Sequence, residues 1–429
     1  MNVRAWAEAS QVAFLELLYD RFDIVAASGP LWMGPACATV ILEPGPSDVA
    51  RILTLERALR GCAYSDDPLR LYQTAAGVAV ELPLPREMRR SISVSQLPLC
   101  QGLRVSIGGD GRGRAYVLDL ESRPHALIAG ASGCGKSEAL RTIVTGLARQ
   151  NEPGEIEMVL VDLEGSTWGE FTLLAHLREP VITRRQDATR MLEGLLGELA
   201  TRDADSVPLV VVIDEVRMLT RDGAMLGLLV DLAERCRKRR VTLVLATQTP
   251  KADVLPTDLT GNLGNLLAGK VNKATTSEVI IGRRGAELLP REPMGDFIDA
   301  GGVRLQAALV TAADVQRLPM SRQATHRPTS DRGEPAEPEV RPTQASEPRA
   351  LESWMRDWIV LHSDVTEEEI RLPGIVRTRQ ALGVGEKAAR RFLEQVYEEL
   401  AASPASPLSP PSPPEETGDS RVIQFVRPA

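Results

Sequence analysis

The sequence predicts an α/β protein whose central part is a parallel sheet covered by helices on both faces. Between about residues 103 and 319, apolar runs rich in Val, Ile and Leu alternate with segments whose apolar residues recur at helical spacing. Strands that are apolar throughout and joined by helices are typical of parallel sheets buried on both sides. The expected strands are residues 125–130, 156–162, 208–215 and 241–248, and the expected helices are residues 137–150, 191–202 and 228–240.

The chain is too long for one compact core, because it has 429 residues and single domains usually have about 100–200. Residues 1–99 combine a helical opening with short β-like runs such as ATVILEP and GVAVELPLP, which predicts a small α+β domain. The further predicted units are the α/β domain at 100–320, a disordered linker at 321–350, a small helical domain at 351–400 and a disordered Pro- and Ser-rich tail at 401–429.

Charge and cysteine usage restrict the class of protein. The net charge of -8 argues against a protein that coats nucleic acid over its whole surface, although the basic cluster at 234–240 keeps DNA binding open. The five cysteines are scattered and lack metal-site spacing, which indicates a reducing compartment. No stretch reaches the roughly 20 apolar residues of a membrane span, and no signal peptide is recognisable, so we expect a cytoplasmic chain without an integral membrane segment.

A phosphate-binding motif follows the first apolar run of the central domain. It fits G-x-x-x-x-G-K-[ST] without a mismatch and opens a helix, which predicts a P-loop that binds ATP with Mg²⁺. We expect Lys136 to neutralise phosphate charge and Ser137 to bind Mg²⁺. The predicted nucleotide-binding residues are Gly130, Ala131, Ser132, Gly133, Cys134, Gly135, Lys136, Ser137 and Glu138.

Acidic residues end the apolar run at 208–215. Asp214 is the predicted second Mg²⁺ ligand, and Glu215 is the predicted catalytic base that polarises water. The alternative is that this acidic pair merely caps the end of a strand. Gln248 ends the run at 241–248, at the sheet edge where ligands of open α/β sheets bind. It could contact the γ-phosphate or merely cap its strand.

With these residues in place, the chain resembles the FtsK/SpoIIIE family of double-stranded DNA translocases. The similarity runs from about residue 34 to 315 and includes RPHALIAGASGCGKS, PLVVVIDE and LVLATQTPKADVLPTDLTGNL. The resemblance implies a RecA-like P-loop motor in a homo-hexameric ring, with double-stranded DNA in the channel and ATP hydrolysed at subunit boundaries. It assigns nucleotide-site roles to Lys136, Ser137, Asp214, Glu215 and Gln248.

The helical segment at 351–400 resembles the small winged-helix domain with which the family often ends. Its sequence suggests two helices around a glycine-containing turn, a helix-turn-helix arrangement in which Lys387, Arg390 and Arg391 could meet phosphates. A solvated helical hairpin that binds no DNA is an equally open interpretation.

Several positions depart from the family pattern. The Asp-Pro-Lys usual after the second strand is here Asp162-Leu163-Glu164, the family's membrane-spanning N-terminus is missing, and arginines expected near the subunit boundary are replaced at 265–267 and 277–278. Basic residues that could stand in for these arginines are Lys270, Lys273, Arg283 and Arg284.

The sequence therefore favours an ATP-driven double-stranded DNA translocase that acts in chromosome or plasmid segregation or in conjugative transfer. One alternative is a coupling or secretion ATPase that moves single-stranded DNA or polypeptide. Another is a nucleotide-gated DNA-binding adaptor without processive motion.

Overall fold

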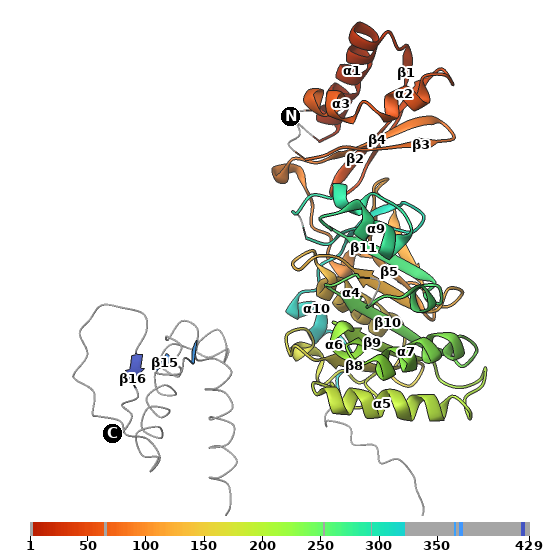
Figure 1. Cartoon of the computed structure of the whole chain (residues 1–429), viewed down its shortest axis with the longest axis vertical. Coiled ribbons are helices and arrows are strands. Elements are labelled where there is room, and N and C mark those ends of the chain that lie inside the picture. Colours follow the sequence, from red (N-terminus) through yellow and green to blue (C-terminus); the bar gives the residue numbers. More distant parts are fainter. Residues whose placement is uncertain are drawn as a thin grey trace, which may run out of the picture. The chain divides into compact units, whose positions relative to one another are not determined.

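The computed structural model describes residues 3–63, 67–251, 254–292 and 294–321, together with three short strands nearer the C-terminus. The chain divides into two compact units, residues 1–330 and 331–429 (Figure 1). In the second unit the described strands are β14(Asp364–Val365), β15(Glu369–Arg371) and β16(Val422–Gln424), which pair antiparallel. β14 and β15 fall within the range 351–400 that was predicted to be a small helical domain, and the rest of that range, including Lys387, Arg390 and Arg391, lies outside the described residues. The predicted linker after Ser321 and most of the predicted tail also lie outside the described residues.

The N-terminal part of the first unit is a four-stranded antiparallel sheet with three helices, drawn in red to orange in Figure 1. Its strand order is β1-β2-β4-β3, and its core joins Phe14 and Leu18 of the first helix to Val40 and Val80 of the central strands. This is the α+β arrangement that the sequence predicts. The elements are α1(Val3–Phe22), β1(Ala26–Met33), β2(Cys37–Pro44), α2(Val49–Leu53), α3(Glu56–Cys62), β3(Arg70–Thr74) and β4(Gly77–Pro83).

A nine-stranded sheet forms the rest of this unit, in the order β6-β5-β13-β12-β11-β7-β10-β9-β8. Five strands from β11 to β8 are parallel, which confirms the predicted α/β class. These are β7(Ala126–Ala129), β8(Glu157–Asp162), β9(Leu209–Asp214), β10(Val241–Thr247) and β11(Asn265–Gly269).

The other four strands are antiparallel, so the sheet is mixed rather than wholly parallel. Short glycine-containing turns join β5 to β6 and β12 to β13, and such short connections allow only antiparallel pairing. The strands are β5(Arg104–Asp110), β6(Ala115–Asp119), β12(Asp296–Asp299) and β13(Arg304–Ala307).

Helices cover both faces of the parallel strands, and the strand residues alternate between two cores. Val210 and Val212 belong to the core that contains α4, whereas Val211 and Ile213 belong to the core that contains α5 and α7. This double burial explains why each strand is apolar throughout. The helices are α4(Lys136–Gln150), α5(Arg185–Glu198), α6(Arg217–Thr220), α7(Gly223–Arg235), α8(Thr257–Thr260), α9(Ala274–Ile281) and α10(Ala312–Gln316).

The described residues of the first unit also form five single turns of 3-10 helix: η1(Arg86–Met88), η2(Val94–Gln96), η3(Gly169–Phe171), η4(Cys236–Lys238) and η5(Ala286–Leu288). All five cysteines are free thiols. In the described part of the chain, no helix combines the length and apolar character that crossing a membrane requires.

A buried ion cluster joins the N-terminal sheet to the antiparallel strands. Arg70 donates to Glu81 Oε1 at 3.0 Å and to the Gly302 carbonyl oxygen at 2.5 Å. Arg304 Nε donates to Asp296 Oδ1 at 2.9 Å, and its Nη1 lies 4.0 Å from Glu81 Oε2. Because each charge is buried beside an opposite one, the cluster fixes the two sheets to each other.

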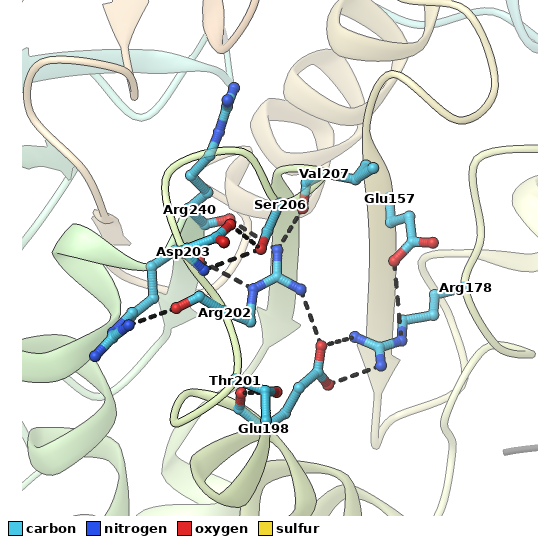
Figure 2. Close-up of polar contacts among 10 residues, drawn as sticks. Glu157, Arg178, Glu198, Thr201, Arg202, Asp203, Ser206, Val207 and Arg240 are labelled. Carbon is cyan, nitrogen blue, oxygen red and sulfur yellow. Dashed lines mark hydrogen bonds and ion pairs between the residues drawn. The ribbon is translucent and has the colours of Figure 1, made fainter. Parts of the chain in front are cut away.

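A second polar network lies where β8, β9 and β10 begin (Figure 2). Glu198 accepts hydrogen bonds from Arg178 and from Arg202, and Arg202 also donates to the carbonyl oxygens of Val207 and Arg239. This network holds the end of the basic cluster at 234–240 against the sheet.

Candidate nucleotide-binding site

The phosphate loop connects the C-terminal end of β7 to the N-terminus of α4. Gly133 and Gly135 have φ angles of 76° and 96°, in the left-handed region that favours glycine. A Cβ atom at Gly135 would lie 2.5 Å from the backbone nitrogen of Gly295, so no side chain fits there. The loop is held on its other side because the Ala131 N–H donates to the Lys270 carbonyl oxygen at 2.8 Å.

Lys136 folds back over this loop. Its Nζ donates to the carbonyl oxygens of Gly130 at 3.1 Å and Ala131 at 3.0 Å, and the residue is only 5% exposed. The ammonium group therefore lies inside the turn, at the N-terminus of α4, where backbone N–H groups and the helix dipole favour an anion.

Asp214, the last residue of β9, lies beside the first turn of α4. Its Oδ2 accepts hydrogen bonds from Ser137 Oγ at 2.8 Å and from Thr167 Oγ1 at 2.7 Å. Mg²⁺ prefers oxygen ligands and usually binds through one or two carboxylates together with phosphate oxygens and waters, so this donor set fits the ion. The described residues contain no group of three or more His, Cys, Asp or Glu that could hold a metal ion.

Glu215 lies next in the chain, in a conformation unusual for a residue with a side chain. Its φ angle is 54°, and the residue is 5% exposed. The carboxylate accepts hydrogen bonds from Thr247 Oγ1 at 3.0 Å and from the Gln248 N–H at 2.8 Å. Backbone strain of this kind is found most often at functional sites, and here the end of β10 supplies the contacts that hold it.

The loop after β8 forms the third wall of the site. Asp162 accepts hydrogen bonds from the backbone N–H groups of Gly165 at 2.8 Å, Thr167 at 2.7 Å and Trp168 at 3.3 Å. Arg141 of α4 donates to the Thr167 carbonyl oxygen at 3.1 Å. These contacts give the loop a fixed shape.

Glu164 lies in the same loop with its side chain exposed. Although the residue is exposed, slight desolvation of its carboxyl group raises the pKa of Glu164, and the negative charges of Glu215, Asp214 and Asp162 raise it further. The loop therefore adds a carboxylate near the site, where the family pattern has a lysine.

The structure brings the predicted residues Lys136, Ser137, Asp214, Glu215 and Gln248 to one edge of the sheet. The observed contact of Gln248 is through its backbone N–H, and its side chain makes no hydrogen bond to any described residue. Thr167 and Asp162 are contacts that the sequence alone did not identify. Their only signal was an acidic strand end followed by Gly-Ser-Thr.

Glu138 and Cys134, two of the predicted nucleotide-binding residues, differ in their side-chain contacts. Glu138 Oε1 accepts the Val310 N–H at 2.6 Å, and its Oε2 lies 3.5 Å from Arg141 Nε. Cys134 is buried, and burial raises the pKa of its thiol. The Glu138 carboxylate is therefore held by residues outside the loop, whereas the Cys134 thiol lies inside the site, 3.9 Å from Lys136 Nζ.

The four basic residues proposed to reach a neighbouring subunit differ in their surroundings. Lys270 Nζ donates to the Glu287 carbonyl oxygen at 2.7 Å, and Arg284 Nε pairs with Glu278 at 2.7 Å. The guanidinium of Arg283 lies against Gly302. Lys273 is exposed, and its side chain makes no hydrogen bond or ion pair with the residues that the structure describes.

Comparison with known proteins identifies relatives of this chain. The sequence model of the FtsK/SpoIIIE family matches residues 100–206. DNA translocase SftA of Bacillus subtilis is 28% identical over 365 residues, which are 73% of this chain and 37% of that protein. DNA translocase FtsK of Lactiplantibacillus plantarum is 27% identical over 331 residues, which are 67% of this chain and 41% of that protein.

Among solved structures, the monomer of the pCW3 conjugation coupling protein TcpA with ATPγS aligns with 71% of this chain and 95% of its own, at 19% identity and a TM-score of 0.49. The chain spans less than half the length of the two curated relatives. The family resemblance seen in the sequence is confirmed by the family match and by these relatives.

Proposed function

Because this chain belongs to the FtsK/SpoIIIE family of P-loop ATPases, we propose that it is an ATP-driven translocase of double-stranded DNA. The observation that carries the proposal is the meeting of three groups at one sheet edge. Nucleotide hydrolysis needs a lysine inside a phosphate loop, a carboxylate bonded to the loop serine and a second carboxylate, which here is held by the end of β10.

Each group has a distinct role in this proposal. The loop N–H groups and Lys136 bind the β- and γ-phosphates of ATP, whereas Ser137 and Asp214 hold Mg²⁺, which would offset phosphate charge when bound. Glu215 accepts a proton from the attacking water. Its bonds from Thr247 and Gln248 fix the carboxylate without neutralising it, since both donors are uncharged.

A complete site needs a further cation near the γ-phosphate, and we propose that a neighbouring subunit of a hexameric ring supplies it. Lys273 is the favoured residue because Lys270 and Arg284 already have partners in their own chain and the guanidinium of Arg283 lies against Gly302. A cation provided in this way can contribute about 10³–10⁵-fold in turnover.

Mixing two inactive variants tests whether neighbouring subunits of a ring share one nucleotide site. Lys273→Ala protein mixed with Lys136→Ala protein should regain part of the ATPase activity, because the two defects lie on opposite sides of a boundary. If Lys273→Ala hydrolyses ATP at the parent rate at every protein concentration, Lys273 is not the supplied cation.

Two assays test whether duplex DNA is the polymer that the ATPase moves. We expect duplex DNA to stimulate ATP hydrolysis, and ATP to drive displacement of a third strand from a triplex on that duplex. Stimulation only by single-stranded DNA or by polypeptide would indicate a coupling or secretion ATPase instead. Duplex binding that depends on ATP but displaces no third strand would indicate a nucleotide-gated adaptor.

A further inference from the structure

Asp214 accepts hydrogen bonds from two different elements of the fold. Ser137 lies on α4, and Thr167 lies on the loop after β8, yet both hydroxyls donate to the same oxygen, Oδ2. We propose that Thr167 is a positioning residue that fixes the Asp214 carboxylate for Mg²⁺, an inference that rests on the proposed nucleotide site.

The geometry explains how two donors set the carboxylate. A carboxylate held at one oxygen by a single donor can still turn about that bond, whereas two donors from different elements restrict its rotation. Oδ1 of Asp214 makes no hydrogen bond to the residues that the structure describes, so its lone pairs stay available. Thr167 thus holds one oxygen and leaves the other for the ion or its waters.

The hydroxyl of Thr167 is itself held in place. Thr167 is 3% exposed, its N–H donates to Asp162 at 2.7 Å, and its carbonyl oxygen accepts from Arg141 at 3.1 Å. The next residue, Trp168, is buried and packs edge-on against Phe171 with ring centroids 5.5 Å apart. With the backbone fixed on both sides, the side chain has little freedom to leave Asp214.

Residues that orient metal ligands from behind typically change metal affinity by about 10–100-fold when they are substituted. Removal of the Thr167 hydroxyl should therefore act on the metal-dependent part of nucleotide binding and leave the metal-independent part unchanged. Among the described residues, no hydrogen bond joins Thr167 to the phosphate loop or to Lys136, so binding of the phosphates themselves is not expected to change.

The experiment uses the full chain and three variants. Thr167→Val removes the hydroxyl and keeps the shape, and Thr167→Ser restores the hydroxyl. Thr145→Val is the matched control, because Thr145 is a buried threonine of α4 whose Oγ1 has no hydrogen-bond partner among the described residues. A fluorescent ATP analogue is titrated in EDTA, and Mg²⁺ is then titrated at saturating analogue.

We expect Thr167→Val to raise the Mg²⁺ midpoint about tenfold or more, with affinity in EDTA unchanged. Thr167→Ser and Thr145→Val should keep the parent midpoint. An unchanged midpoint in Thr167→Val, an equal loss of affinity in EDTA, or a failure of serine to restore the midpoint would each overturn the proposal. Failure of the parent chain to bind the analogue at all would instead overturn the proposed nucleotide site.

Discussion

Charged side chains gather at two edges of the sheet, the edge where the parallel strands begin and the edge where they end, but their bonding partners differ. Where β8, β9 and β10 begin, Glu198 is shared between Arg178 and Arg202, and each charge has an opposite one beside it (Figure 2). Where the same strands end, Asp214 and Glu215 are held by hydroxyls and a backbone N–H.

The difference separates charges that hold the fold from charges suited to bind a ligand. An ion pair offsets the charge of both partners, whereas neutral donors fix a carboxylate and leave its charge in place. Lys136 likewise donates to carbonyl oxygens and forms no ion pair with a described residue. We expect substitutions at the first edge to change stability and substitutions at the second edge to change chemistry.

The largest effect is expected at Glu215. Glu215→Gln keeps the size of the side chain but removes the base, so ATP turnover should fall about 10²–10⁴-fold while ATP still binds. Steady-state hydrolysis and equilibrium nucleotide binding measure the two quantities separately. Parent-like turnover in this variant would mean that the base lies elsewhere.

Lys136 is expected to act on binding instead. A hydrogen bond to a charged group contributes about 1.5–3 kcal/mol, so Lys136→Ala should weaken nucleotide binding roughly 10–100-fold. The free energy of unfolding without nucleotide serves as the control, because it should change much less than the binding energy. A variant with weakened folding and parent-like nucleotide affinity would assign Lys136 to the structure rather than to the ligand.

Glu198 tests the other edge. Glu198→Gln leaves Arg202, which is 7% exposed, without its carboxylate, and should lower the free energy of unfolding by about 1–3 kcal/mol. Nucleotide affinity should be unchanged. Glu193→Gln on the same helix is the control, since that carboxylate is exposed and has no partner among the described residues. Equal stability of the two variants would contradict a structural role for Glu198.

Acid should abolish the contribution of Glu198 to the free energy of unfolding. Burial on its own raises the pKa of Glu198, but hydrogen bonds from Arg178 and Arg202 lower it below the usual value. A lowered folded-state pKa stabilises the fold above the unfolded-state pKa of about 4.3, and this stabilisation is lost as pH falls through the folded-state pKa. The stability difference between the parent and Glu198→Gln should therefore be largest near neutral pH and shrink below about pH 4, as urea titrations would show.

The smallest effect is expected at Glu164. Its exposed carboxylate adds negative charge beside Asp214 and Glu215, so Glu164→Gln should tighten metal-free nucleotide binding by about two- to fivefold at low salt. The gain should fade as salt is added. A gain that persists in high salt would point to a change in the loop rather than to charge.

Local motifs explain what the sequence could predict of the site. The glycines, Lys136 and Ser137 lie within one short segment whose spacing dictates its geometry, and Asp214 and Glu215 end an apolar strand. Thr167 could not be predicted in this way, because it meets Asp214 only when the loop after β8 folds around Asp162.

The fold shows the same limit. Apolar runs predicted the parallel strands, because burial on both faces leaves a continuous signal. The antiparallel strands were missed because β12 and β13 have four residues each, and their pairing depends on contacts distant in sequence. The expectation that Glu138 binds nucleotide stays a prediction, and the hydrogen bond that its carboxylate accepts from Val310, more than 170 residues away, could not be read from the sequence.

The buried ion cluster has a mechanical consequence. The Gly295 N–H donates to the Cys134 carbonyl oxygen at 2.8 Å, and the next residue, Asp296, is bonded to Arg304 beside Glu81 of the N-terminal sheet. Asp296, which the ion cluster holds, is thus adjacent in sequence to Gly295, which contacts the phosphate loop. We therefore expect a force that displaces the N-terminal sheet to be transmitted to the phosphate loop through these two residues.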